Sequence, residues 1–109
     1  MNKKIPNKTK VVVIGGGVIG CSVAYHLAKF GWRDTIVLER DQLTSGTTWH
    51  AAGLVRQLGT SAAVTKIRKY SLDLYKQLEK EVDHSAGLRL NGALSIAENK
   101  GRWQELQRQ

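Results

Sequence analysis

The sequence predicts an α/β fold in which an incomplete parallel strand–helix–strand unit is followed by the start of a second sheet. Three observations predict this fold. The β-branched run at 11–14 is typical of a parallel strand buried on both faces. Apolar residues recur at helical spacing over 19–30, and a second apolar run at 35–38 leads directly to Glu39. Because only two strands of the first sheet are recognisable, we expect that sheet to be incomplete.

The first helix follows a glycine-rich turn and is expected over 19–30. Its residues Val23, Leu27 and Phe30 share one face, which we expect to cover the sheet. Gly31 is suited to end the helix in a left-handed conformation. The unit is therefore expected to close with the helix packed against both strands.

A turn-rich stretch over 41–59 precedes a long amphipathic helix, which the sequence predicts over 61–82. Either Ser61 or Thr60 is expected to cap it. The predicted apolar face repeats at helical spacing and consists of Val64, Ile67, Ser71, Leu74, Leu78 and Val82.

The last part of the chain contains two short apolar segments, 88–90 and 93–97, on either side of Asn91-Gly92. This pattern predicts two strand pieces joined by a tight hairpin turn or by a bend. They form the expected start of the second sheet. Residues 101–109 are predicted to begin another helix.

The composition restricts the class of protein. The 109 residues and single cysteine allow at most one domain, without disulfides. The net charge is +8, but the basic residues are dispersed, which favours a solvated surface over a nucleic-acid interface. No apolar segment approaches the ~18 residues of a spanning helix. We therefore expect no membrane partner and a cytoplasmic location, or the mitochondrial matrix in a eukaryote.

Three reactive side chains have ordinary explanations. Cys21 occupies a helix position that requires a small apolar side chain, which favours packing over redox chemistry. His26 and His84 lack partners at the spacing of metal ligands. The sequence therefore predicts no metal site.

The first glycine-rich turn has the pattern of a dinucleotide site. Gly15 permits a tight turn, Gly17 lets the backbone approach a pyrophosphate, and Gly20 lets the helix pack closely on the strand. The N-terminal end of that helix favours phosphate. Glu39 follows about 20 residues later, where it can accept hydrogen bonds from an adenosine ribose. This context favours a Rossmann-like site over an ordinary turn, and Arg40 is expected to be solvated because Glu39 repels a 2′-phosphate.

The second loop, residues 44–53, suggests which dinucleotide is bound. Its hydroxyl side chains can donate hydrogen bonds to a pyrophosphate or to ring atoms, and Gly46 and Gly53 let the backbone pass close to a bulky planar group. A nicotinamide dinucleotide site does not require this loop. The two loops together therefore predict FAD.

At this point the sequence resembles the dimethylglycine and sarcosine dehydrogenases of the D-amino-acid-oxidase superfamily. The resemblance rests on 11–39 and above all on 43–54, and it extends through 92–97. In that family the histidine of the Trp-His pair carries covalently bound FAD, which places this role on His50. A neutral imidazole is a competent nucleophile near about pH 7. The alternative is a histidine that packs beside Trp49 or binds a phosphate.

The resemblance also implies how the chain is organised. It implies that 10–109 is the truncated N-terminal part of an FAD-binding domain. Residues 1–9 are lysine-rich and contain no apolar stretch of the length a signal peptide needs, so we expect them to form a disordered lead-in. The catalytic residues are expected beyond Gln109, where the resemblance also allows tetrahydrofolate to bind. The cofactor-binding residues predicted from the motifs and the resemblance are Gly15, Gly17, Val18, Ile19, Gly20, Glu39, Arg40, Thr44, Ser45, Gly46, Thr47, Thr48, His50, Gly53 and Leu54.

The resemblance implies an FAD-dependent amine oxidoreductase that acts on CH–NH bonds. The implied substrate is a small N-methylated glycine derivative, such as dimethylglycine or sarcosine, whose N-methyl group is oxidised. The electron acceptor is not specified by the sequence. The alternative is a non-catalytic regulatory subunit, because the pyruvate dehydrogenase phosphatase regulatory subunit resembles the same family.

Overall fold

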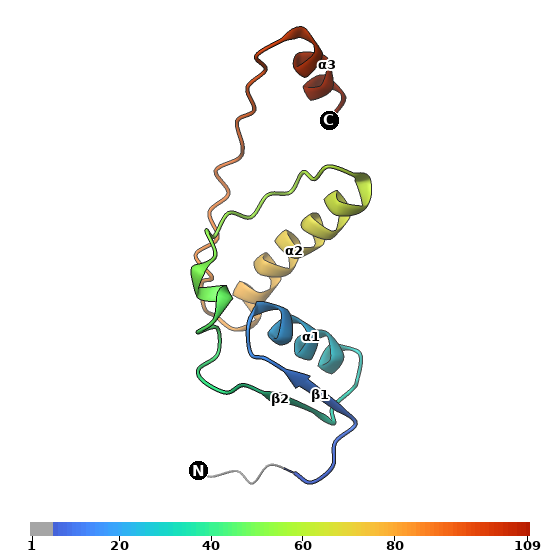
Figure 1. Cartoon of the computed structure of the whole chain (residues 1–109), viewed down its shortest axis with the longest axis vertical. Coiled ribbons are helices and arrows are strands. Elements are labelled where there is room, and N and C mark those ends of the chain that lie inside the picture. The colour runs from blue at the N-terminus through green and yellow to red at the C-terminus, as the bar shows by residue number, and fades with distance from the viewer. Residues whose placement is uncertain (1–5) are drawn as a thin grey trace. The chain divides into compact units, whose positions relative to one another are not determined.

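The computed structural model describes residues 6–109, which form two compact units, 6–53 and 54–109. Figure 1 shows the order of their elements along the chain. The first unit contains β1 (Val11–Ile14), α1 (Val18–Lys29), β2 (Thr35–Leu38) and the 3-10 helix η1 (Thr47–His50), and the second contains α2 (Ala62–Glu81) and α3 (Lys100–Arg108).

The predicted strand–helix–strand unit is confirmed. β1 and β2 pair in parallel, with Val11 opposite Thr35 and Ile14 opposite Leu38. This register places the ends of the two strands side by side, so that the residues that follow them meet at one edge of the sheet.

Helix α1 packs on the sheet through a face that includes the predicted Leu27 but not the predicted Val23 and Phe30, which are exposed. A Cβ atom on Gly20 would collide with the backbone oxygen of Gly15 and lie 3.4 Å from Val13 Cγ1, so the helix approaches the strand most closely here. Ala24 and Leu27 lie on the same helical face and are half-buried. Phe30, by contrast, is 77% exposed, because it lies to one side of the face that this close approach turns toward the sheet. Gly31 ends the helix with φ 88°, as predicted.

The expectation that β1 is buried on both faces is wrong. Burial alternates along the strand, and Ile14 is 85% exposed. Helix α1 packs against the two strands, but no other helix or strand of residues 6–53 covers the opposite face of the sheet. In the first unit, as elsewhere in residues 6–109, no apolar side chain is fully buried.

The second unit contains the predicted long helix. α2 begins after Ser61, whose Oγ accepts a hydrogen bond from the Val64 N–H at 3.3 Å and thereby caps the helix. Val82 lies just beyond the helical residues. Helix α3 is also present and is capped by Asn99, whose Oδ1 accepts from the Arg102 N–H at 2.8 Å.

The predicted strand pieces at 88–90 and 93–97 are wrong as strands. Within residues 6–109 the only sheet consists of β1 and β2, so the start of a second sheet is not formed there. Gly92 has φ 74°, but neither the predicted hairpin turn nor the predicted bend is formed at residues 91–92. A strand requires a partner with which to exchange backbone hydrogen bonds, and alternating apolar residues specify a face without supplying that partner.

Part of the predicted lead-in, residues 1–5, lies outside the described residues, so the expectation for 1–9 stays a prediction. Thr9 itself is bonded to the turn before β2, because its Oγ1 donates to the Asp34 backbone oxygen at 2.9 Å. None of the helices described in 6–109 is both long and apolar enough to cross a membrane.

Candidate functional site

The glycine-rich turn lies at the sheet edge where the two strands end. Gly15 continues the ladder, since its N–H donates to the Leu38 backbone oxygen at 2.8 Å. Its φ of 101° lies in the left-handed region, which residues with a Cβ rarely adopt. The chain can therefore turn directly from β1 into α1. This turn brings the N-terminus of the helix to the end of the sheet at which Glu39 follows β2.

The N-terminus of α1 presents unpaired backbone donors. The first helical hydrogen bond that closes the turn runs from the Cys21 N–H to the Gly17 oxygen at 2.9 Å. The N–H groups of Ile19 and Gly20 have no hydrogen-bond partner among residues 6–109. Such donors at the positive end of a helix are suited to bind an anion such as a phosphate.

Glu39 is held in place by three backbone N–H groups. Its Oε2 accepts from the Gly16 N–H at 2.6 Å, and its Oε1 accepts from the N–H groups of Arg40 and Asp41 at 2.8 and 3.1 Å. The hydrogen bonds from Gly16 and Asp41 are the main causes that lower the pKa of Glu39 below its ordinary value. A carboxylate has about four acceptor positions, so this ionised group can still accept from a hydroxyl.

Gly16 is a site residue that the sequence analysis did not single out. It is the one residue among 6–109 that is classed as buried. A Cβ atom there would collide with Leu43 Cδ2 and lie 3.2 Å from Glu39 Oε2. Its position between two functional glycines was the only sequence signal, because the side chains that crowd it come from later in the chain.

The second loop packs on the first through backbone and side-chain contacts. The Thr44 N–H donates to the Gly16 oxygen at 3.0 Å, and the Thr48 Oγ1 accepts from the Val18 N–H at 3.0 Å. Thr44 has φ 67°, an unusual conformation for a β-branched residue. Strain of this kind is typically retained where the surrounding contacts determine the conformation. The structure thus brings the two predicted loops together.

His50 lies at the end of η1 with its side chain exposed. Its Nδ1 is 3.1 Å from the Gly46 backbone oxygen. A carbonyl oxygen can only accept, so Nδ1 carries the proton in this hydrogen bond. In the neutral imidazole, Nε2 then keeps its lone pair, and the hydrogen bond to Gly46 does not involve this nitrogen.

The remaining predicted residues are less well positioned. Ser45 is paired locally, since its Oγ donates to the Gln42 oxygen at 2.8 Å. Arg40 and Thr47 are exposed, and Gly53 has φ 70° at the end of the first unit. Leu54 belongs to the second unit, so its expected place beside the cofactor stays a prediction.

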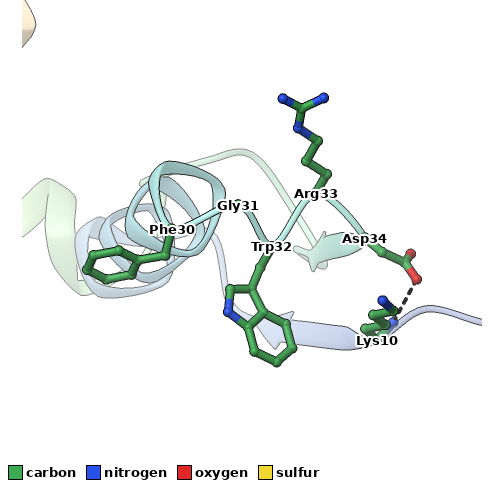
Figure 2. A pocket seen from close by; sticks show the side chains of 6 residues that line it. All are labelled: Lys10, Phe30, Gly31, Trp32, Arg33 and Asp34. Carbon is green, nitrogen blue, oxygen red and sulfur yellow. Dashed lines mark hydrogen bonds between the residues drawn. The ribbon is translucent and has the colours of Figure 1, made fainter.

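A separate hollow lies at the opposite edge of the same sheet, before β1 and β2 begin (Figure 2). Two of its lining residues are joined by a hydrogen bond from the Lys10 backbone N–H to the Asp34 side-chain oxygen Oδ2 at 3.2 Å. Because Gly15 and Glu39 follow the strands, this hollow is not part of the candidate site. It is lined by Lys10, Phe30, Gly31, Trp32, Arg33 and Asp34. The residues described in the structure contain no cluster of three potential metal ligands.

Comparison with known proteins identifies relatives across almost the whole chain. Residues 10–109 match the family model described as FAD dependent oxidoreductase. The chain is 45% identical to a 4-methylaminobutanoate oxidase (formaldehyde-forming) of Paenarthrobacter nicotinovorans, over 94% of its length, and 43% identical to the human mitochondrial sarcosine dehydrogenase, over 98%. It is 39% identical to the mouse mitochondrial pyruvate dehydrogenase phosphatase regulatory subunit, over 95%. It spans about 12% of the length of each of these relatives.

The chain therefore belongs to the family of FAD-dependent oxidoreductases. The predicted resemblance is confirmed, since sarcosine and dimethylglycine dehydrogenases are among its relatives.

Proposed function

We propose that the chain forms the FAD-binding part of an oxidoreductase that oxidises the N-methyl group of a small amino acid, such as sarcosine or dimethylglycine. The observation that carries the proposal is the packing of the second loop on the first. Thr44 and Thr48 hydrogen-bond to Gly16 and Val18, so the hydroxyl-rich loop lies at the N-terminus of α1. A site for a nicotinamide dinucleotide has no need of that second loop.

Each half of the cofactor has residues of suitable chemistry. The free N–H groups of Ile19 and Gly20 are suited to the pyrophosphate. Glu39, with its pKa lowered by backbone donors, is suited to the ribose hydroxyls. Residues 44–48 supply further hydroxyl groups for the pyrophosphate and the ring. The bound flavin would accept hydride from the substrate.

His50 is the proposed point of covalent attachment. Its Nδ1–H is donated to the Gly46 oxygen, which leaves Nε2 as the nucleophilic nitrogen. The same hydrogen bond restrains the orientation of the ring although the side chain is exposed. The competing role, in which His50 only packs or binds a phosphate, requires no such free lone pair.

The substrate class rests on the relatives and on no residue of this chain. Two relatives have names that refer to sarcosine and to 4-methylaminobutanoate, which are both N-methylated amino acids. We propose that the groups that bind the substrate, any folate site and the contact with an electron acceptor lie outside these 109 residues.

A regulatory role is the second candidate, because one relative is named as a phosphatase regulatory subunit. The glycine-rich turn, Glu39 and the second loop are compatible with either role. A regulatory protein could bind FAD without oxidising a substrate, so flavin binding and turnover have to be measured separately.

The test is flavin retention after acid precipitation of the intact protein. We expect flavin to remain with the precipitated wild type and to be released from His50→Ala. His84→Ala is the matched control, because His84 is an exposed histidine in the second unit. Release of all flavin from the wild type would disprove covalent attachment. Retained flavin without reduction by sarcosine, dimethylglycine or 4-methylaminobutanoate would favour the regulatory role.

A further inference from the structure

The three α-helices differ in how their first turns are capped. α2 and α3 are capped by the side chains of Ser61 and Asn99, which directly precede them. The residue at the same position of α1 is Gly17, which has no side chain to supply. An acceptor in the second loop binds the first turn of α1 instead, because Thr48 Oγ1 accepts the N–H of Val18, the first helical residue, at 3.0 Å. Ser61 and Asn99 accept from the third residue of their helices.

The absence of a side chain on Gly17 is what allows this contact. A Cβ atom on Gly17 would lie 3.0 Å from Thr48 Oγ1, a tighter approach than most carbon–oxygen contacts. Thr48 is half-buried, whereas its neighbours in 44–50 are exposed. The hydroxyl of Thr48 therefore pairs one of the free N–H groups in the first turn of α1, as a helix cap does, although it comes from a residue 30 positions after Val18.

From this geometry we infer that Thr48 is a positioning residue that caps α1 and fixes the second loop to the helix N-terminus. His50 lies two residues further along the same turn, η1, so the cap also restrains the approach of His50. The inference deepens the proposed function and rests on it in one respect, which is that the fixed loop serves FAD binding.

The cap does not obstruct the anion-binding donors. Thr48 takes only the Val18 N–H, and the N–H groups of Ile19 and Gly20 keep no partner among residues 6–109. A hydroxyl can accept one hydrogen bond while it donates another. Thr48 can therefore cap the helix in the flavin-free protein and stay in place when a phosphate binds.

The test compares Thr48→Val, Thr48→Ser and the control Thr60→Val in the intact protein. Thr60 is an exposed threonine in the second unit, and Ser61 rather than Thr60 caps α2. The first measurement is amide hydrogen exchange of residues 16–20 and 41–53 without flavin. The second is FAD affinity in a His50→Ala background, where binding is reversible.

Loss of a cap typically destabilises a helix by an amount that corresponds to about a five-fold change in an equilibrium constant. We expect Thr48→Val to exchange about five-fold faster in both segments and to bind FAD about five-fold more weakly. Thr48→Ser should restore both values, because it keeps the hydroxyl, and Thr60→Val should match the parent.

Unchanged exchange in Thr48→Val would overturn the capping role. Faster exchange with unchanged FAD affinity would overturn the positioning role and leave the proposed function intact. If the parent itself bound no FAD, the proposed function would fail together with the positioning role, and the exchange data would still show whether Thr48 caps α1. Failure of Thr48→Ser to restore exchange would show that the hydroxyl is not the active group.

Discussion

The hydrogen bonds within each of the two units span very different numbers of residues along the chain. In the first unit, side-chain hydrogen bonds join Thr9 to Asp34, Gly16 to Glu39 and Val18 to Thr48, which are 25, 23 and 30 residues apart. In the second unit, the longest side-chain hydrogen bond identified joins Arg68 to the Leu58 oxygen, ten residues away. The first unit therefore links distant segments, whereas the second is organised by neighbours.

This difference shows which parts of the family's fold are specified locally. The turns of the first unit converge on one sheet edge, where the Gly16 N–H donates to Glu39 and the Gly16 oxygen accepts from Thr44 in the second loop. In the second unit, α2 has a good cap but no buried residue, and Ile67 is 66% exposed.

The largest expected effect concerns the stability of residues 1–109 produced alone. No apolar side chain in 6–109 is fully buried, and a two-stranded sheet is marginal by itself. We expect no cooperative thermal unfolding, a tendency to aggregate and weak FAD binding. Calorimetry and FAD titration test this expectation, with the intact protein as control. A sharp transition together with tight FAD binding would contradict it and would show that the first unit's contacts suffice.

A pair of glycine substitutions compares the two units directly. At Gly20 an added Cβ collides with the backbone oxygen of Gly15. At Gly59 the closest atoms are Cγ1 and Cβ of the Val64 side chain, at 2.5 and 2.9 Å, and the nearest backbone atom is the Thr65 nitrogen at 3.1 Å. Backbone can yield less than a side chain, so Gly20→Ala should cost about 3 kcal/mol or more and Gly59→Ala about 1 to 2 kcal/mol.

Denaturant unfolding of the intact protein measures both costs. Gly101, which lies within α3, serves as the control position. A Cβ atom added by Gly101→Ala would make only an ordinary 3.4 Å contact with Asn99 Oδ1. If Gly59→Ala proved as costly as Gly20→Ala, the close approach of helix and strand would not distinguish the first unit.

The sequence predicted local elements much better than it predicted contacts between them. β2 occupies the expected residues, α1 differs by one residue at each end, and Ser61 caps α2. These features depend on hydrophobic period, glycine conformation and capping chemistry, which are all encoded within a few residues.

The missed features depend on residues that are distant in sequence. The importance of Gly16 arises from Leu43 and Glu39, and the cap of α1 arises from Thr48. The segment 88–97 has an apolar pattern suited to strands, but strand formation also requires a partner that the pattern does not identify. The burial of β1 was overestimated for a related reason, because the run of β-branched residues does not show which layers cover it.

A smaller effect is expected from Glu39→Ala, which removes the carboxylate that binds the Gly16 N–H and that we propose binds the ribose. Loss of a charged hydrogen-bond partner should weaken FAD binding about ten- to a hundred-fold in Glu39→Ala, measured in the His50→Ala background. Glu98→Ala is the matched control, since Glu98 is an exposed glutamate of the second unit. An unchanged dissociation constant in Glu39→Ala would move the ribose contact to other residues.

The smallest expected effect is on the pH dependence of stability, and it distinguishes a carboxylate of the first unit, Glu39, from one of the second unit, Asp73. Hydrogen bonds from the backbone of Gly16 and Asp41 lower the pKa of Glu39 below its ordinary value of 4.5, and the hydrogen bond from Lys69 lowers the pKa of Asp73 below 3.8. A pKa that is lower in the folded state means that the folded state favours the ionised carboxylate. Its contribution to stability is therefore complete above the ordinary value and is lost as the pH falls through the folded pKa.

Asp73 lies in exposed ion pairs with Lys69 and Lys76 on α2, and such pairs contribute little in water. Glu39 is half-buried and receives hydrogen bonds from fixed backbone groups, one of which, Gly16 N–H, ties the glycine-rich turn to the end of β2. We expect Glu39→Gln to reduce the loss of stability of the intact protein between about pH 5 and about pH 3, and Asp73→Asn to leave that loss almost unchanged. Urea unfolding at a series of pH values measures both variants. An equal effect of the two substitutions would mean that the long-range hydrogen bond to Gly16 matters no more to folding than an ion pair between neighbours on a helix.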